Sequence, residues 1–527
     1  MNIGAIPEIY ARRIPDQPAL VNGLDGRTLS WLQLERRTAS LAAGLRDACR
    51  VGPRDSVAML STNSSEYFET IYASARLGAN TAGLNWRSSV DELRTWLEAI
   101  NPAVLVCEDV LAEKGSQLAQ SFAVRLLTFG PQSDGSYERV ITNGAQLPAV
   151  AYAGLYGRDF PALTINTGGT TGTSKGAVHT HGSLLAIFET QAIAESITSR
   201  DSYLMMGQMF HIVGAIPLAY AARGCPVTHI NFDPELALEA MINYRTTATT
   251  GLPTMLDYLI KANDERGVEL PFWRTMQYGG GPFSPRLIKE LLERFPCDLL
   301  QAYGCSETNV ATYLWPDEHR RAVAEGDDEL LRTAGREFGL VQVAVVDEDR
   351  NEVDRDGKTV GEIIVRSPTM FKRYTSDCSD PLRDGWFATG DLATWNSDRY
   401  ITVAGRKKEM IISGGENIYP AHLERAIREL DGVLEAAVIG AADDRWGETP
   451  VAFVVTAPDR GPDSAMVIAH IERRLGSWQR PRDVVFMDAL PKNPNGKVMK
   501  AELHGLAAGN TLPADTVSVW TQTSRIK

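Results

Sequence analysis

The chain has 527 residues, too many for one hydrophobic core, so we expect two or more domains. Hydrophobic residues make up 44% of the chain and charged residues 23%, as in ordinary globular proteins. The formal net charge of −13 argues against a nucleic-acid-binding surface, which would normally carry an excess of basic residues.

Cysteine usage and the N-terminal segment favour a cytoplasmic protein. The 6 cysteines are scattered without a C-x-x-C pair, which predicts neither a zinc site nor a disulfide framework. The segment "MNIGAIPEIYARRIPDQPALV" carries charges and prolines where a secretory signal needs an apolar run. No stretch approaches the roughly 18–20 apolar residues of a membrane span. We therefore expect a cytoplasmic enzyme without a membrane span.

Up to about residue 330, short apolar runs alternate with amphipathic helical patterns. Helical patterns occupy residues 65–78 and 284–295. The apolar runs are "SVAML" (56–60), "AVLVC" (103–107), "PVTHINF" (226–232) and "DLLQAYG" (298–304). This alternation predicts βα units around largely parallel sheets.

From about residue 340 the pattern changes to short alternating strands, such as "GEIIVRS" and "YITVAG", separated by polar turns. These strands predict a small β-barrel-like unit. A helical pattern in "PAHLERAIREL" and two further strand patterns follow a basic stretch, "RKKE". We therefore predict an α/β fold with an N-terminal domain over residues 1–407 and a small α+β C-terminal domain over residues 408–527.

A loop rich in glycine and hydroxyl groups, "TGGTTGTSKG" (167–176), is typical of polyphosphate binding. It is not the common G-x-x-x-x-G-K-[ST] loop, because Ser174 precedes the lysine and Gly176 follows it. Glycine lets backbone N–H groups face an anion, and threonine and lysine add further donors. The candidate phosphate-binding residues are Thr167, Gly168, Gly169, Thr170, Thr171, Gly172, Thr173 and Lys175.

The loop resembles the phosphate signature T-S-G-[ST]-T-G-x-P-K-G of the adenylate-forming superfamily, which comprises acyl- and aryl-CoA synthetases, peptide-synthetase adenylation domains and firefly-type luciferases. Two positions depart from that signature, Gly168 for serine and Ser174 for proline. One change removes a hydroxyl and the other a rigid turn, so we expect a more mobile loop and altered pyrophosphate binding.

Further signatures resemble the same family in the family's own order, over almost the whole chain, and are closest to acyl-CoA synthetases. They are "MFHIVG" (209–214), "YGGGPFS" (278–284), "QAYGCSETN" (301–309), the long stretch over residues 384–424, and "LPKNPNGKVMK" (490–500). The resemblance implies that Mg²⁺-ATP and a carboxylic acid give an acyl-adenylate and pyrophosphate, and that the thiol of coenzyme A then gives acyl-CoA and AMP.

The resemblance also assigns roles in the adenylation step. Glu307 would be the ligand of Mg²⁺, which prefers one or two carboxylates together with phosphate oxygens. Tyr303 would stack on adenine, and Asp391 would accept hydrogen bonds from the ribose hydroxyls with Arg406 beside it. Lys497 would neutralise charge between the substrate carboxylate and the α-phosphate. Residues that would border the nucleotide or the acyl group are His211, Gly279, Gly280, Gly281, Gly304 and Ser306.

For the second step the resemblance implies a mobile C-terminal domain that rotates about Lys408. The rotation would withdraw Lys497 and bring Gly414 and Gly415 towards the active site, where the missing side chains leave room for a pantetheine arm. Free CoA is the expected acceptor, with a carrier protein as the alternative. A homodimer is left open as the assembly.

The sequence excludes one alternative function, but it leaves two others and the class of carboxylic acid open. A serine hydrolase is excluded at Ser306, because its nucleophile elbow requires glycine where Thr308 stands. A non-catalytic scaffold, or an enzyme competent in one half-reaction only, is an alternative because of the altered phosphate loop. Aromatic, fatty and polycyclic acids are all open as substrates.

Overall fold

The computed structural model describes residues 2–150, 156–167, 175–281, 283–375, 380–443, 445–457, 460–492, 498–508 and 517–518. By its internal packing the chain divides into two compact units. The first comprises Met1–Val343 and Val365–Phe387, and the second comprises Ala344–Ile364 and Ala388–Lys527. The boundary expected between residues 407 and 408 stays a prediction.

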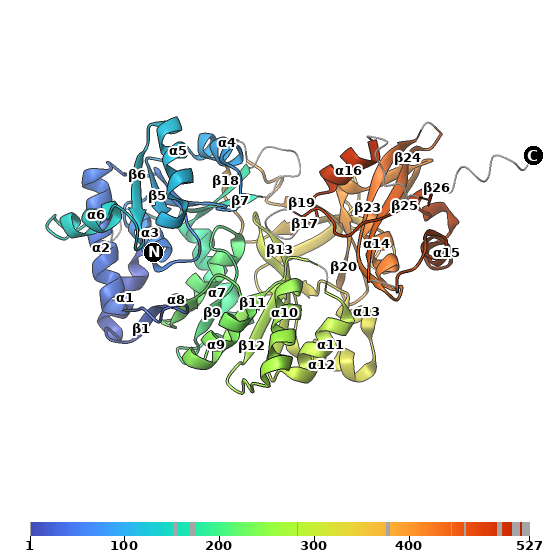
Figure 1. Cartoon of the computed structure of the whole chain (residues 1–527), viewed down its shortest axis with the longest axis horizontal. Coiled ribbons are helices and arrows are strands. Elements are labelled where there is room, and N and C mark those ends of the chain that lie inside the picture. The colour runs from blue at the N-terminus through green and yellow to red at the C-terminus, as the bar shows by residue number, and fades with distance from the viewer. Residues whose placement is uncertain are drawn as a thin grey trace, which may run out of the picture. The chain divides into compact units, whose positions relative to one another are not determined.

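One sheet of the first unit has seven described strands in the order β18-β8-β7-β4-β3-β5-β6 (Figure 1). The strands β7, β4, β3, β5 and β6 pair in parallel, whereas β8 pairs antiparallel with β7 and β18. The bounds are β3 (Ser56–Leu60), β4 (Asn80–Leu84), β5 (Val104–Glu108), β6 (Arg125–Phe129), β7 (Pro161–Thr167), β8 (Lys175–Thr180) and β18 (Arg373–Tyr374).

A second sheet of this unit has nine described strands in the order β15-β14-β13-β12-β11-β9-β10-β1-β2. From β13 to β1 the neighbours run parallel, and β14, β15 and β2 add antiparallel edges. The bounds are β1 (Pro18–Asn22), β2 (Thr28–Ser30), β9 (Tyr203–Met205), β10 (Val227–His229), β11 (Ala248–Gly251), β12 (Thr275–Gly279), β13 (Asp298–Cys305), β14 (Asn309–Leu314) and β15 (Arg336–Glu337).

Helices connect these strands, as the alternation of patterns predicts. Serine side chains cap the starts of several helices, and Ser30 forms a reciprocal capping box with Gln33 in α2. The helices are α1 (Ile6–Arg13), α2 (Trp31–Ala48), α3 (Ser65–Arg76), α4 (Val90–Ile100), α5 (Ala112–Phe122), α6 (Ser136–Gly144), α7 (His181–Ala194), α8 (Ala215–Ala221), α9 (Pro234–Tyr244), α10 (Pro253–Arg266), α11 (Pro285–Arg294), α12 (Pro316–Glu325) and α13 (Asp328–Leu331).

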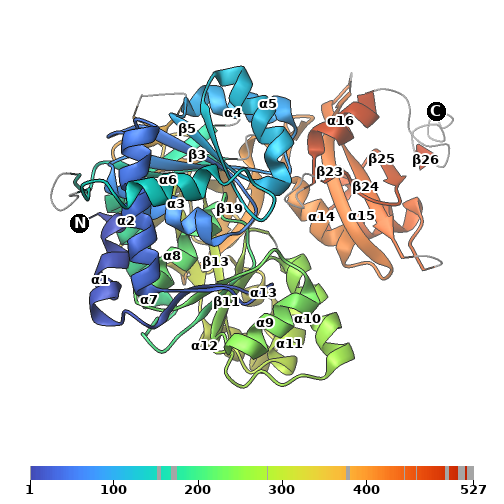
Figure 2. The same ribbon diagram turned by 60° about the vertical axis from the view of Figure 1, so that its left-hand side comes forward.

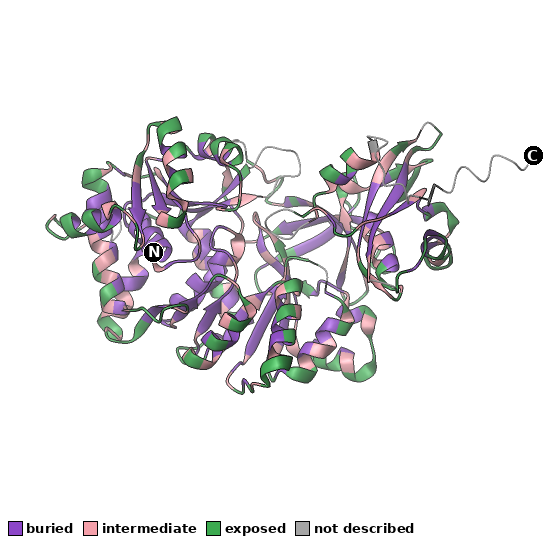
Figure 3. Cartoon of the chain, viewed as in Figure 1, coloured by how far each residue is buried: buried purple, intermediate pink, exposed green. Residues whose placement is uncertain are grey.

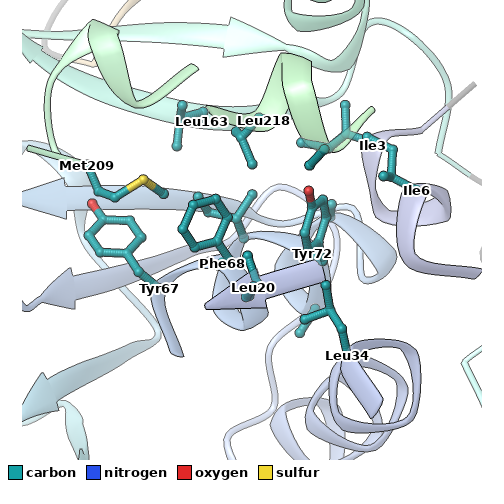
Figure 4. Close-up of a cluster of buried hydrophobic side chains, with 14 of the residues drawn as sticks. Ile3, Ile6, Leu20, Leu34, Tyr67, Phe68, Tyr72, Leu163, Met209 and Leu218 are labelled. Carbon is teal, nitrogen blue, oxygen red and sulfur yellow. The ribbon is translucent and has the colours of Figure 1, made fainter. Parts of the chain in front are cut away.

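The largest buried cluster of the first unit forms around α3. Its aromatic side chains Tyr67, Phe68 and Tyr72 contribute to one hydrophobic core together with Leu20 of β1 and Leu163 of β7 (Figure 4). Both sheets therefore share a core, which fixes the ends of their strands relative to one another within this unit.

The second unit contains a four-stranded sheet, β16-β17-β19-β20, and a six-stranded sheet in which β22, β21, β24, β25 and β26 follow one another and β23 also pairs with β24, as counted over the described residues. The bounds are β16 (Gln342–Val346), β17 (Gly361–Arg366), β19 (Phe387–Trp395), β20 (Ile401–Arg406), β21 (Ile411–Ser413), β22 (Glu416–Ile418), β23 (Val433–Asp443), β24 (Gly447–Thr456), β25 (Asp483–Phe486), β26 (Val517–Ser518), α14 (Pro420–Arg428), α15 (Ser464–Leu475) and α16 (Lys500–Ala508).

Strand β24 shows why this sheet carries helices on both faces (Figure 2). Val454 belongs to the core that also contains residues of α14 and α15. Its neighbours Phe453 and Val455 belong to the opposite core with Leu503 of α16. Successive side chains of a strand point to opposite faces, so an uninterrupted apolar run requires cover on both sides.

The architecture confirms the predicted α/β class, with extensive βα sheets in the first unit and an α+β part towards the C-terminus. Purple strands between green-faced helices in Figure 3 show the buried sheets. In the part of the chain that the structure describes, every helix is too short or too polar to cross a membrane.

Candidate active site

The two ends of the glycine-rich loop lie together on the antiparallel pair β7–β8. Thr167 and Lys175 face each other in the register, and Thr167 Oγ1 donates a hydrogen bond to the Lys175 carbonyl over 2.7 Å. Two parts of the predicted site fall outside the described residues. They are the loop residues Gly168, Gly169, Thr170, Thr171, Gly172 and Thr173, and the predicted catalytic residue Lys497.

Lys175 and Glu307 both contact one aromatic side chain, Tyr374 of β18. The Tyr374 hydroxyl donates a hydrogen bond to Glu307 Oε1 over 2.8 Å. The Lys175 ammonium lies 5.3 Å from the centre of the same ring, within the range of a cation–π contact. The structure thus brings together the loop lysine and the carboxylate that the sequence predicts, and it adds a tyrosine that the sequence analysis missed.

The turn that carries Glu307 joins β13 to β14 and is held by its backbone. Phe371 N–H donates to the Glu307 carbonyl over 2.8 Å, and Thr369 Oγ1 donates to the Thr308 carbonyl over 2.8 Å. His179 Nε2 contacts the Ser306 carbonyl at 2.8 Å. Burial lowers the pKa of His179 to about 4, so its neutral ring donates this hydrogen bond at ordinary pH. The backbone of the turn is therefore fixed before any ligand binds.

The three glycines follow the end of β12, next to β13. Gly279 lies opposite Ala302, so Tyr303 and Gly304 come directly after that pair. A side chain at Gly279 would overlap the Ala302 carbonyl, and Gly280 has a φ of +76°. Close backbone approach and a left-handed conformation thus explain glycine at these two positions. Gly280 and Gly281 are exposed, and Tyr303 is half-buried on the neighbouring strand.

Tyr278, which precedes these glycines, forms a hydrogen bond with a buried histidine. The Tyr278 hydroxyl lies 2.7 Å from His319 Nε2, and His319 Nδ1 lies 2.7 Å from the Trp315 carbonyl. A carbonyl can only accept, so Nδ1 carries the proton and Nε2 accepts from Tyr278. His211 lies elsewhere in the first unit, half-buried before the short turn Ile212–Gly214, with its ring 4.5 Å from that of Phe210.

Asp391 and Arg406 of the second unit form a cross-strand ion pair between β19 and β20. Arg406 Nε lies 2.9 Å from Asp391 Oδ1, and the carboxylate is nearly buried. Arg406 also donates to the Thr389 carbonyl over 3.2 Å. A solvent-open hollow adjoins the pair, and its lining comprises Thr389, Gly390, Arg406, Lys407 and Lys408. The hollow offers several cationic groups beside one fixed carboxylate.

Gly414 and Gly415 form the two-residue turn of the hairpin β21–β22. Ser413 pairs with Glu416, and the two glycines have φ values of +60° and +90°. Two central residues with positive φ define the hairpin turn that strongly favours glycine. A Cβ on Gly414 would lie 2.6 Å from the ring of Trp446, whereas a Cβ on Gly415 would meet no atom within 4 Å. The turn itself therefore accounts for both glycines, and only one of them is also sterically confined.

Lys500, the last residue of the predicted lysine motif, is held by two carboxylates. Its ammonium lies 2.8 Å from Glu424 Oε1 and 3.1 Å from Glu409 Oε2. These two carboxylates raise the pKa of Lys500 in spite of its burial. Glu409 is the neighbour of Lys408, so one lysine ties the C-terminal motif to the predicted hinge.

The donor set at Glu307 fits Mg²⁺ only together with a phosphate ligand. Within the described residues, no group of three or more His, Cys, Asp or Glu side chains could hold a metal ion. Mg²⁺ is usually held by one or two carboxylates, water and substrate phosphates, so a single carboxylate beside a phosphate loop is a suitable donor set.

Comparisons with known proteins find similarity over almost the whole chain. The family model described as "AMP-binding enzyme" matches residues 8–375, and the model described as "AMP-binding enzyme C-terminal domain" matches residues 422–497. The chain is 35% identical to the indoleacetate–CoA ligase of Aromatoleum aromaticum over 93% of this chain and 95% of that protein. It is 34% identical to a feruloyl-CoA synthase of an Amycolatopsis species over 95% of this chain and 98% of that protein. The crystal structure of ATP-bound MatB from Rhodopseudomonas palustris matches with a TM-score of 0.83 at 28% identity, over 96% of this chain and 99% of that chain.

Proposed function

Because the chain belongs to the AMP-binding enzyme family, we propose that it activates an aromatic carboxylic acid with ATP and transfers the acyl group to coenzyme A. The predicted membership of the adenylate-forming superfamily near the acyl-CoA synthetases is confirmed, as is the class of AMP-forming acid–thiol ligase. The observation that carries the proposal is the placement of Lys175 and Glu307 around Tyr374 at the end of the loop.

Adenylation must bring a carboxylate against the α-phosphate of ATP, so the barrier is largely electrostatic and positional. Lys175 binds phosphate oxygens at the end of the loop. Lys497 contacts both the carboxylate and the α-phosphate. Glu307 holds Mg²⁺, which would neutralise phosphate charge when it is bound.

Separate groups bind the adenine and the ribose of the nucleoside in this proposal. Tyr303 stacks on adenine, with the backbone of Gly279, Gly280 and Gly281 along its edge. Asp391 accepts from the ribose hydroxyls, and its ion pair with Arg406 supports this role because it fixes one carboxylate oxygen at 2.9 Å. Gly304 and Ser306 complete the nucleotide side. His211 borders the acyl group.

Thioester formation requires the C-terminal domain, residues 408–527, to rotate about Lys408. The rotation withdraws Lys497 and presents the hairpin turn of Gly414 and Gly415 to the pantetheine arm. The exposure of Lys408 and of both glycines supports this step.

The aromatic character of the acid is supported by two relatives, whose names specify indoleacetate and ferulate. The three glycines after β12 leave space for a flat acyl group, and the exposure of Gly280 and Gly281 agrees with this. A cytoplasmic location belongs to the same proposal. Whether the enzyme is a homodimer is a separate question for light scattering.

The test is a panel of aromatic, fatty and polycyclic acids incubated with ATP, Mg²⁺ and CoA, with acyl-AMP and acyl-CoA measured separately by mass. We expect acyl-CoA and AMP from aromatic acids. Acyl-CoA from fatty acids alone would contradict the aromatic substrate. Acyl-AMP that is transferred to a phosphopantetheinyl carrier protein but not to CoA would contradict the acceptor.

A further inference from the structure

We propose that Tyr374 is a positioning residue that holds Glu307 ready for Mg²⁺ beside Lys175. This inference rests on the proposed function, in which Glu307 is the magnesium ligand and Lys175 binds phosphate. Tyr374 belongs to none of the motifs that identify the family in this sequence, and it lies on a strand of only two residues.

The hydrogen bond between Tyr374 and Glu307 has a fixed direction. A phenol carries its proton at neutral pH, and an ionised carboxylate can only accept a hydrogen bond. Tyr374 therefore donates to Glu307 Oε1, over 2.8 Å. A hydrogen bond to an ionised acceptor is stronger than one between neutral groups, and this one restricts how the carboxylate can turn.

The ring of Tyr374 contacts the lysine. Tyr374 pairs with Ala177 on β8, and Lys175 lies two residues before Ala177 on the same strand. Residues two apart on a strand share a face, and the Lys175 ammonium lies 5.3 Å from the ring centre. Tyr374 therefore contacts both charged side chains, which form no direct ion pair with each other among the described residues.

The backbone around Tyr374 reinforces this arrangement. Phe371, in the same segment, packs against Tyr374 with ring centres 4.8 Å apart and donates its N–H to the Glu307 carbonyl. Thr375 N–H donates to the Gly176 carbonyl over 2.9 Å. One short segment thus holds both the backbone and the side chain of Glu307, and it is tied to the strand that carries Lys175. Partners that orient a metal ligand in this way are known to affect metal affinity.

The test compares Tyr374→Phe and Tyr374→Leu by equilibrium binding of a non-hydrolysable ATP analogue, with and without Mg²⁺. Tyr374→Phe keeps the ring, so binding without Mg²⁺ should be unchanged, while the Mg²⁺ concentration at half-saturation should rise by roughly tenfold. Tyr374→Leu should also weaken binding without Mg²⁺. Tyr258→Phe is the matched control, because Tyr258 also has a lysine over its ring, Lys261 at 5.7 Å, but is 56% exposed.

A double-mutant cycle with Glu307→Gln separates metal positioning from a general effect on the fold. In the Glu307→Gln background, Tyr374→Phe should have no further effect on the Mg²⁺ dependence. An unchanged Mg²⁺ dependence in Tyr374→Phe alone would overturn the inference, as would an equal loss of binding with and without Mg²⁺. Failure of the unmodified protein to bind the analogue with Mg²⁺ would instead contradict the proposed function.

Discussion

The hydroxyl of Tyr278 donates a hydrogen bond to Nε2 of His319 over 2.7 Å, and Tyr278 directly precedes the three glycines, of which the first ends β12. Burial lowers the pKa of His319 to about 4, and its Nε2 can accept this bond only while the ring is neutral. The position of the glycine segment is therefore coupled to the protonation of one buried histidine.

The first prediction concerns acid stability. His319 titrates near 6.5 when unfolded and near 4 when folded, so the stabilisation is complete above pH 6.5 and is lost as the pH falls towards 4. Over this range the free energy of unfolding of His319→Gln should fall by less than that of the unmodified protein. The difference between the two falls should be up to about 3 kcal/mol. Chemical denaturation at pH 7 and pH 4.5 measures the difference. His504→Gln is the control, since His504 is exposed. Equal pH slopes in all three proteins would contradict the assignment.

The second prediction is a loss of stability as the pH rises, whereas the first is a loss of stability as the pH falls. Burial raises the pKa of Glu195 to about 7, although hydrogen bonds from Tyr220 and Gln191 lower it. The folded state therefore binds this proton more tightly than the unfolded state, and stability should fall as the pH rises from 4.5 through 7. Glu195→Gln should flatten this fall in unfolding experiments at pH 5 and pH 8. Glu189→Gln, at an exposed position of helix α7, which Glu195 directly follows, should behave like the unmodified protein.

The third prediction separates the two glycines of the hairpin turn. Gly414→Ala forces a methyl group within 2.6 Å of Trp446, whereas Gly415→Asn places a residue that tolerates positive φ in open space. We expect Gly414→Ala to lower acyl-CoA formation by about tenfold or more while acyl-AMP formation is retained. Gly415→Asn should keep the fold. Any change in its acyl-CoA formation would therefore measure the space that the pantetheine arm needs beside the turn. Gly267→Ala, also at positive φ without neighbours within 4 Å, controls for backbone strain alone. Equal losses in both half-reactions would contradict the assigned role.

The fourth prediction concerns Lys500. Its replacement by methionine leaves Glu409 and Glu424 without their shared cation, which releases the end of the lysine motif. Acyl-AMP formation should fall more than thioester formation from pre-made acyl-AMP. Arg474→Met, which removes the ion pair with Glu429 in the same unit but outside the motif, is the matched control. If both variants reduce acyl-AMP formation equally, Lys500 has no special role in holding the motif.

The sequence predicted the elements with strong periodicity and the residues inside familiar motifs. The run over residues 56–60 is strand β3, and the pattern over residues 284–295 is helix α11 with its serine cap. Tyr374 could not be found in this way, because 67 residues separate it from Glu307 and it reaches the strand of Lys175 only through the pairing of β18 with β8. His179 belongs to no predicted site, and the structure shows that its Nε2 contacts the Ser306 carbonyl.

The fifth prediction tests the central claim, that a mobile lysine serves adenylation but not thioester formation. In Lys497→Ala, acyl-AMP formation from ATP and acid should fall by roughly 10²–10³-fold, because a charge-stabilising group is removed. Acyl-CoA formation from pre-made acyl-AMP and CoA should continue at the unmodified rate. Mass-resolved measurement of both products in the same variant is the most direct test. Acyl-AMP formation at the unmodified rate in Lys497→Ala would contradict the account.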